Sequence, residues 1–134
     1  MVGKNILLVE DDEIILMVLD NFFRKAGWTT FLAENGLEGL EMVTSKNDIE
    51  VIITDIMMPM MDGKTMSGRI REIPHYHNTP ILAITAGSLA QEMEDNFYPF
   101  DVILEKPILL KQLNSIILSL LSDKKSRSDL NVKF

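Results

Sequence analysis

The chain alternates short apolar runs with longer amphipathic segments, and it does so five times. An apolar run that is nearly continuous is typical of a strand buried on both faces. A regular strand–helix alternation predicts a parallel sheet with helices packed on both sides. The five predicted strands are Asn5–Glu10, Trp28–Ala33, Val51–Asp55, Pro80–Ala86 and Val102–Lys106. We therefore expect a single doubly wound α/β domain.

The segments between these runs carry apolar residues at helical spacing. In the first, Ile14, Ile15, Val18, Leu19 and Phe22 form the stripe that we expect to face the core, and Gly27 ends the helix. The remaining predicted helices are 36–45, 63–72, 89–96 and 109–121. The apolar pattern stops at Leu121. We thus expect a domain over residues 4–121 and a loose polar tail or linker stub over 122–134.

Composition excludes several classes of function. The 134 residues contain no cysteine, which rules out disulfides and thiolate metal sites and is compatible with a cytoplasmic location. The formal net charge of −7 argues against nucleic-acid binding, which needs a basic surface. No apolar stretch approaches the roughly 20 residues of a membrane helix, and the N-terminus lacks the pattern of a secretory signal.

Polar side chains gather where the predicted strands end. In a doubly wound sheet, ligands bind beyond the carboxyl ends of the strands. Those ends carry Asp11 and Asp12, Asp55, Thr85 and Lys106. Clustered carboxylates repel one another unless a cation lies between them, and hard oxygen ligands with open positions suit Mg²⁺. A carboxylate can accept a phosphoryl group whose oxygens a lysine and a hydroxyl bind.

These residues carry a resemblance to a known family. The motifs ILLVEDD, TDIMMPMMDG, ITA and EKP occur in this order at the ends of the first, third, fourth and fifth strands. The chain resembles the receiver domain of two-component response regulators from about Lys4 to Leu121. Each motif alone is weakly specific, but four in order are strong. The resemblance implies a flavodoxin-like fold of five strand–helix units with strand order 2-1-3-4-5.

The resemblance also implies a chemistry. Asp55 would take a phosphoryl group from a histidine kinase or a histidine phosphotransferase in a Mg²⁺-dependent reaction. Asp12 would be the more direct Mg²⁺ ligand, Asp11 would hold its waters, and the main-chain carbonyl of Met57 would complete the protein's share of the metal shell. Such a domain is not an enzyme acting on other substrates, but it assists its own phosphorylation and dephosphorylation.

Residues beyond the acids follow from the same resemblance. Lys106 would pair with the phosphoryl oxygens, and Thr85, with Ala86 beside it, would bind them as the switch. The Lys106–Pro107 peptide bond would be cis. Gly63 has a structural role, as the start of a helix after the turn that Asp62 opens.

The chain departs from the family pattern on the side that usually carries the output. The family usually has tyrosine or phenylalanine where this chain has Ile103, so a switch based on tyrosine rotation is excluded here. Pro99 stands where glycine is frequent, and the fourth helix is expected to be short or shifted. Phe97, Tyr98 and Phe100 are expected in the core, with a partner surface as the alternative.

Several residues have plainer explanations. Instead of binding metal, Asp12 could serve simply as the N-cap of the first helix. Glu10 is taken as peripheral to the site. The methionines at 57, 58, 60 and 61 are expected to pack adaptably around the loop rather than bind copper. His75 and His77 are expected to be solvent-exposed at the opposite end of the strands.

Other functions compete with phosphoryl acceptance. A phosphatase-type enzyme would carry a second aspartate two residues past Asp55, where this chain has Met57. A phosphorylation-independent interaction module would keep the fold alone, and a flavin-binding module would need a phosphate-cradling loop after the first strand. For a receiver, the kinase and the downstream target are open, and a homodimer could form on phosphorylation.

Overall fold

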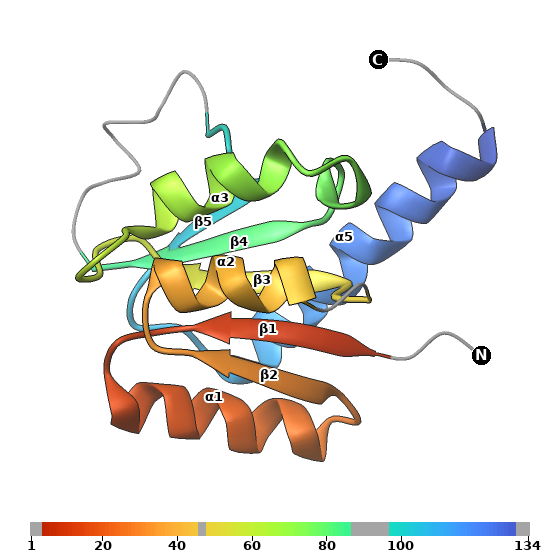
Figure 1. Cartoon of the computed structure of the whole chain (residues 1–134). Helices are drawn as coiled ribbons and strands as arrows, with labels where there is room; N and C mark the ends of the chain where they lie inside the picture. Colours follow the sequence, from red (N-terminus) through yellow and green to blue (C-terminus); the bar gives the residue numbers. More distant parts are fainter. Residues whose placement is uncertain (1–3, 46–47, 87–96, 131–134) are drawn as a thin grey trace.

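The computed structural model describes residues 4–45, 48–86 and 97–130, with side chains as far as Ser122. Ten elements of regular structure lie in these ranges (Figure 1). The strands are β1 (Asn5–Val9), β2 (Thr29–Ala33), β3 (Val51–Asp55), β4 (Ile81–Thr85) and β5 (Val102–Glu105). The helices are α1 (Glu13–Lys25), α2 (Gly36–Ser45), α3 (Gly63–Arg71), α5 (Leu110–Leu130) and a short 3-10 helix, η1 (Pro74–Tyr76).

The strands form one parallel sheet in the order β2-β1-β3-β4-β5, which confirms the predicted fold. The middle strands β1, β3 and β4 are buried almost throughout, as their apolar sequences predicted. Because all strands run the same way, their carboxyl ends lie at one edge of the sheet, at the left in Figure 1.

Helices cover both faces of the sheet (Figure 1). On one face, α2 and α3 bury Val43, Met66 and Ile70 against alternate residues of the strands. On the other face, α1 buries Phe23 and α5 buries Leu113 against the remaining strand residues. This two-sided packing holds the strand ends in a fixed relation to one another.

The predicted core stripe of α1 was wrong in part. Ile14 and Val18 are 75% and 50% exposed, and Met17 beside them is 69% exposed. The buried residues of the helix are instead Leu16, Leu19 and Phe23. Residues 14–19 are all apolar, so two overlapping stripes were available, and contact with the sheet selects between them.

The helix α5 also differs from its prediction. It continues to Leu130, so residues 122–130 are helical rather than a loose tail. The apolar period ends where packing against the sheet ends, whereas the helix itself meets no Gly or Pro before Leu130. Its last part extends beyond the sheet in Figure 1. The domain boundary at residue 121 stays a prediction.

The predicted helix over residues 89–96 lies outside the described residues. Just after it, Phe100 is buried in the core, as expected, while Phe97 and Tyr98 are 38% and 57% exposed. Among the described helices, none has the length and apolar character needed to cross a membrane.

Candidate functional site

The register of the central strands decides which acid lies beside Asp55. Val9, the last residue of β1, pairs with Thr54 of β3. The next residue, Glu10, continues the ladder on its other side through a backbone hydrogen bond from its N–H to Ala33 of β2. Glu10 and Asp55 are thus neighbours at the carboxyl edge of the sheet.

Three carboxylates and one ammonium group meet at this edge. One carboxylate oxygen from each of Glu10, Asp11 and Asp55 lies within 4.8 Å of the others. The Lys106 Nζ lies 3.4 Å from Glu10 Oε1 and 3.4 Å from Asp55 Oδ2, bridging the two acids. Glu10 is 3% exposed, so the expectation that it is peripheral was wrong.

The charges of this cluster shift one another's ionisation. Burial raises the pKa of Glu10, and the nearby Asp55 charge adds to that effect. The backbone N–H of Asp12 and the Lys106 ammonium act in the opposite sense. Burial lowers the pKa of Lys106, but the charges of Asp55 and Glu10 outweigh it, and the net shift is upward. Lys106 therefore stays positively charged beside Asp55 at neutral pH.

Asp12 lies outside this cluster. Its Oδ1 accepts hydrogen bonds from the backbone N–H groups of Ile14 (2.9 Å) and Ile15 (3.1 Å), which makes it the N-cap of α1. The capping role is therefore present in the structure. The role of Asp12 as a metal ligand stays a prediction, and the cluster of carboxylates contains Asp11 and Glu10 instead.

The backbone around Asp55 is tightly held. Asp55 Oδ1 accepts a hydrogen bond of 2.7 Å from the N–H of Ile56, and the Asp55 carbonyl accepts one of 2.7 Å from Thr54 Oγ1. The N–H of Gly63 donates to the Ile56 carbonyl at 2.8 Å. A Cβ at Gly63 would overlap the Asp55 carbonyl oxygen, so glycine is required there for the first turn of α3 to approach the acid.

Replacing Gly63 with alanine is expected to destabilise the fold by about 1–3 kcal/mol, because the new methyl group must displace the Asp55 backbone. The matched control is Gly68→Ala in the same helix, where a Cβ meets nothing within 4 Å. That control should gain up to about 1 kcal/mol of helix propensity. Urea unfolding of both variants measures the difference, and equal stabilities would contradict the proposed role of Gly63.

Thr85 closes the fourth strand beside the cluster. It is 1% exposed, its Oγ1 lies 3.3 Å from the Ala86 carbonyl oxygen, and its own carbonyl accepts a 2.8 Å hydrogen bond from the N–H of Lys106. The Lys106–Pro107 peptide bond is cis. The structure thus brings Asp11, Asp55, Thr85 and Lys106 to one edge.

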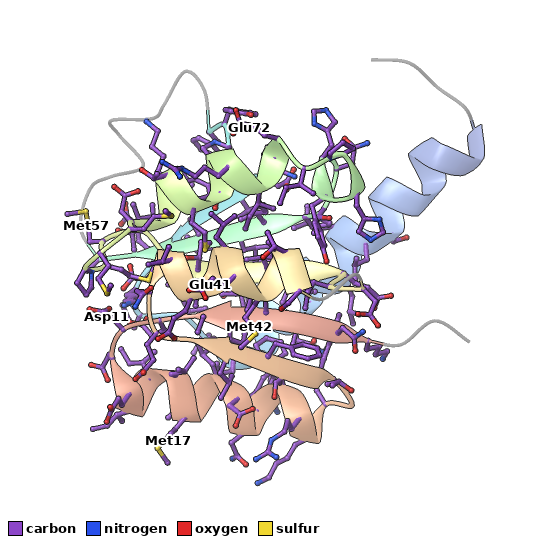
Figure 2. All side chains as sticks on the ribbon, viewed as in Figure 1. Asp11, Met17, Glu41, Met42, Met57 and Glu72 are labelled. Atoms are coloured by element: carbon purple, nitrogen blue, oxygen red, sulfur yellow. The ribbon has the colours of Figure 1, made fainter. Side chains whose placement is uncertain are left out.

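The methionines of the loop from β3 to α3 divide into two pairs. Met58 and Met61 pack against the core, as expected for adaptable packing. Met57 and Met60 are instead 71% and 78% exposed, and Met60 has a φ of 70°. Figure 2 shows Met57 and Asp11 at the same end of the sheet. Met57 therefore lies at the carboxyl edge of the sheet, and its proposed metal contact stays a prediction.

The sequence as a whole matches a model of the response regulator receiver domain over residues 6–118. The chain belongs to the response regulator receiver family. This confirms the resemblance that the four motifs indicated.

Individual proteins are similar to this chain in sequence, in fold or in both. It is 31% identical over 123 residues to the Saccharomyces cerevisiae transcription factor SKN7, covering 91% of this chain and 19% of that protein. A receiver protein from Sinorhizobium medicae superimposes with a TM-score of 0.79 at 32% identity, covering 90% of this chain and 95% of the other. This receiver spans between 5% and 25% of the lengths of the curated relatives compared.

The acidic cluster of this receiver fits a divalent cation. Three carboxylate oxygens within 4.8 Å of one another are a hard, anionic ligand set, and a single lysine compensates part of their charge. The receiver domain of the Pseudomonas aeruginosa sensor kinase PA1611 carries a magnesium ion in its active-site cleft. It superimposes with a TM-score of 0.80 at 26% identity and covers 90% of this chain and 98% of that one.

The two histidines of this receiver lie far from that cluster. Both are exposed in the segment before β4, at the opposite edge of the sheet, as predicted. His77 Nδ1 lies 3.1 Å from the Arg71 carbonyl oxygen at the end of α3. Ile103, the residue that replaces the usual aromatic, is 9% exposed and packs in the core.

Proposed function

We propose that this receiver accepts a phosphoryl group on Asp55 from a histidine kinase or a histidine phosphotransferase, in a reaction that depends on Mg²⁺. The observation that carries the proposal is the position of Lys106 Nζ, 3.4 Å from both Asp55 and Glu10 within the acidic cluster. One ammonium group leaves negative charge uncompensated among three carboxylates, which is the environment that a divalent cation and a phosphoryl group complete.

The transfer step forms and breaks one bond each. An oxygen of Asp55 forms a bond to phosphorus as the bond from phosphorus to the donor's leaving nitrogen or oxygen breaks, and the leaving atom keeps the electron pair. Lys106 is positioned to bind a phosphoryl oxygen in place of Asp55 Oδ2. The hydroxyl of Thr85 and the N–H of Ala86 are proposed to bind the other phosphoryl oxygens, which would draw Thr85 toward Asp55.

Glu10, Asp11 and Asp55 are the residues whose side chains would hold the cation, with the Met57 carbonyl as a further ligand. When bound, Mg²⁺ supplies positive charge that offsets the negative charge of the phosphoryl oxygens. The protein's own part is to hold Glu10, Asp11 and Asp55 close together, while the Asp12 carboxylate caps α1.

The surface around the site supports a protein as phosphoryl donor. Ile14, Met17 and Val18 of α1 are exposed, and Ile14 lies in the first turn after Asp11 and Asp12. Figure 2 shows Met17 on the outer side of α1, directed away from the sheet. Three exposed apolar residues on one helix, close to a charged site, are typical of a docking surface. Curated relatives of this chain include hybrid histidine kinases.

The readout is proposed to pass through β5 and α5, together with the predicted helix over residues 89–96, which lies outside the described residues. Ile103 would transmit it through aliphatic packing, because no aromatic ring occupies this position. The downstream target stays open, and dimerisation on phosphorylation is one proposed route for the readout. A cytoplasmic location belongs to the same proposal.

Metal removal gives the direct test. The purified protein should incorporate phosphoryl label from acetyl phosphate when Mg²⁺ is present, because the cluster then lacks its excess negative charge. Labelling should fall at least about a hundredfold when a chelator removes the metal. Label incorporated equally with and without Mg²⁺ would contradict the proposed metal dependence. No label under either condition would favour a phosphorylation-independent interaction module.

A further inference from the structure

A buried guanidinium group lies at the edge of the sheet opposite the phosphorylation site. Arg71, the last residue of α3, has a side chain that is only 7% exposed. Burying a charge is costly unless it is paired and hydrogen-bonded. The hydrogen bonds and the ion pair of Arg71 therefore show which parts of the fold its buried charge stabilises.

The guanidinium group joins the segments that lead into the last two strands. Its Nη1 donates to the carbonyls of His77 (3.0 Å) and Thr79 (2.5 Å), just before β4. Its Nε donates to the Pro99 carbonyl (3.0 Å), and its Nη2 donates to Asp101 Oδ2 (2.8 Å), just before β5. Arg71 thus binds the start of both strands at once.

Asp101 links the Arg71 contacts to the register between β4 and β5. Its Oδ2 also accepts the N–H of Ile81 at 2.8 Å, and its own N–H donates to the Ile81 carbonyl at 2.9 Å. These two contacts pair Asp101 with the first residue of β4. The pairing of Leu82 with Val102 follows from it, and so does every later pair.

β5 needs such an anchor because it is short and weakly specified by its own side chains. It has four residues, of which only Ile103 is buried, and β4 is its one neighbour in the sheet. Register is strongly fixed only where a strand buries one full face. A slip of one residue would turn Ile103 out of the core and carry Lys106 away from Asp55.

We propose that Arg71 is a positioning residue for phosphoryl transfer, which sets the place of Lys106 at the site by fixing the register of β5. The proposal rests on the function proposed above. The geometry of α3 strengthens it, because the first turn of this helix packs on the Asp55 backbone through Gly63. One helix therefore locates the acceptor at one end and the strand bearing its lysine at the other.

The experiment compares two quantities in the same variants: the rate of labelling by acetyl phosphate, and Mg²⁺ affinity by isothermal titration calorimetry. Arg71→Met should label about tenfold more slowly, because Lys106 contributes to the transfer step. Its Mg²⁺ affinity should stay within about twofold of the wild type, since Glu10 and Asp11 follow β1 and Asp55 ends β3, and neither strand is held by Arg71. Arg69→Met is the matched control, with the same substitution at an exposed position of the same helix. It should label like the wild type.

A double variant separates positioning from general damage. Lys106→Met alone should slow labelling about a hundredfold. If Arg71 acts through Lys106, adding Arg71→Met to it should slow labelling no further. Asp101→Asn is a milder second variant, should Arg71→Met fold poorly. It weakens the anchor without removing the guanidinium group and should slow labelling about threefold.

The outcomes distinguish this proposal from the function on which it rests. A wild-type protein that takes no label overturns the proposed function. A labelled wild type with an Arg71→Met variant that labels equally fast overturns the positioning role. So does a parallel loss of Mg²⁺ affinity, or a further tenfold loss in the double variant, since either result means that Arg71 acts on the fold as a whole.

Discussion

Asparagine at position 55 is expected to abolish phosphoryl labelling by acetyl phosphate and Mg²⁺. An amide oxygen cannot form the stable acyl phosphate that a carboxylate forms. The substitution also removes one of the three clustered carboxylates and the negative charge that pairs with Lys106. Asparagine keeps an oxygen that can accept the N–H of Ile56, so the bond that orients the side chain of Asp55 can remain. Intact-mass analysis counts the phosphoryl groups, and far-UV circular dichroism checks the fold.

The matched control is Asp62→Asn, an aspartate on the same loop that caps α3 through the N–H of Thr65. Asparagine caps helices as well as aspartate does, so this variant should label like the wild type. Label that survives Asp55→Asn would place the acceptor elsewhere and end the proposal. Steady release of phosphate from an ester substrate would instead revive a phosphatase-type enzyme.

The fold was predictable because its strands are buried on both faces. Each central strand is a short apolar run, which is typical of a strand buried on both faces of a parallel sheet. The alternation of these runs with helices indicates that the strands are parallel. The strand order came from the resemblance to receivers, since the pattern of apolar residues does not encode which strands are neighbours. The structure confirms that order.

Helix faces and ends were less predictable for identifiable reasons. In α1, six consecutive apolar residues at 14–19 leave the buried stripe undetermined until the sheet selects Leu16 and Leu19. In α5, the apolar period reports packing and not helicity, so it ends before the helix does at Leu130. As a result, Ile14 and Val18 are exposed and form apolar surface beside the site.

The acids assigned to the cation from sequence differ by one residue from those that cluster in the structure. The resemblance to receivers assigned Asp11 and Asp12 to the metal, and Glu10 was taken as peripheral. β1 ends at Val9, and Glu10 joins Asp11 and Asp55 in the acidic cluster. The role of Asp12 as a metal ligand stays a prediction, and in the structure this residue caps α1. A signal for this was present in the sequence: an aspartate before a run of helix-forming residues is a strong N-cap, and Asp12 fits that position.

Substitutions at these three acids should separate the two assignments by Mg²⁺ affinity. Asp11→Asn should weaken Mg²⁺ binding roughly 10- to 100-fold, which corresponds to the loss of one interaction with a charged group. Glu10→Gln should weaken it about tenfold, because it removes a buried charge from the cluster while an amide oxygen can still accept the N–H of Asp12. Asp12→Asn should change the affinity by about twofold or less, since this side chain is exposed and outside the cluster.

The design works because asparagine preserves the cap at position 12. Asp12→Asn should therefore leave the stability of α1 unchanged, whereas Asp12→Ala should cost about 0.5–2 kcal/mol in urea unfolding without a matching loss of Mg²⁺ affinity.

The opposite pattern, in which Asp12→Asn loses metal and Glu10→Gln keeps it, would restore the pair assigned from sequence. It would also require the Asp12 carboxylate to leave the N–H groups of Ile14 and Ile15 when the cation binds. Because those two hydrogen bonds hold the first turn of α1, cation binding would then loosen the helix next to the exposed Ile14, and amide exchange at residues 14 and 15 would speed up on adding Mg²⁺. With Glu10 and Asp11 as the ligands, amide exchange at these two residues stays unchanged.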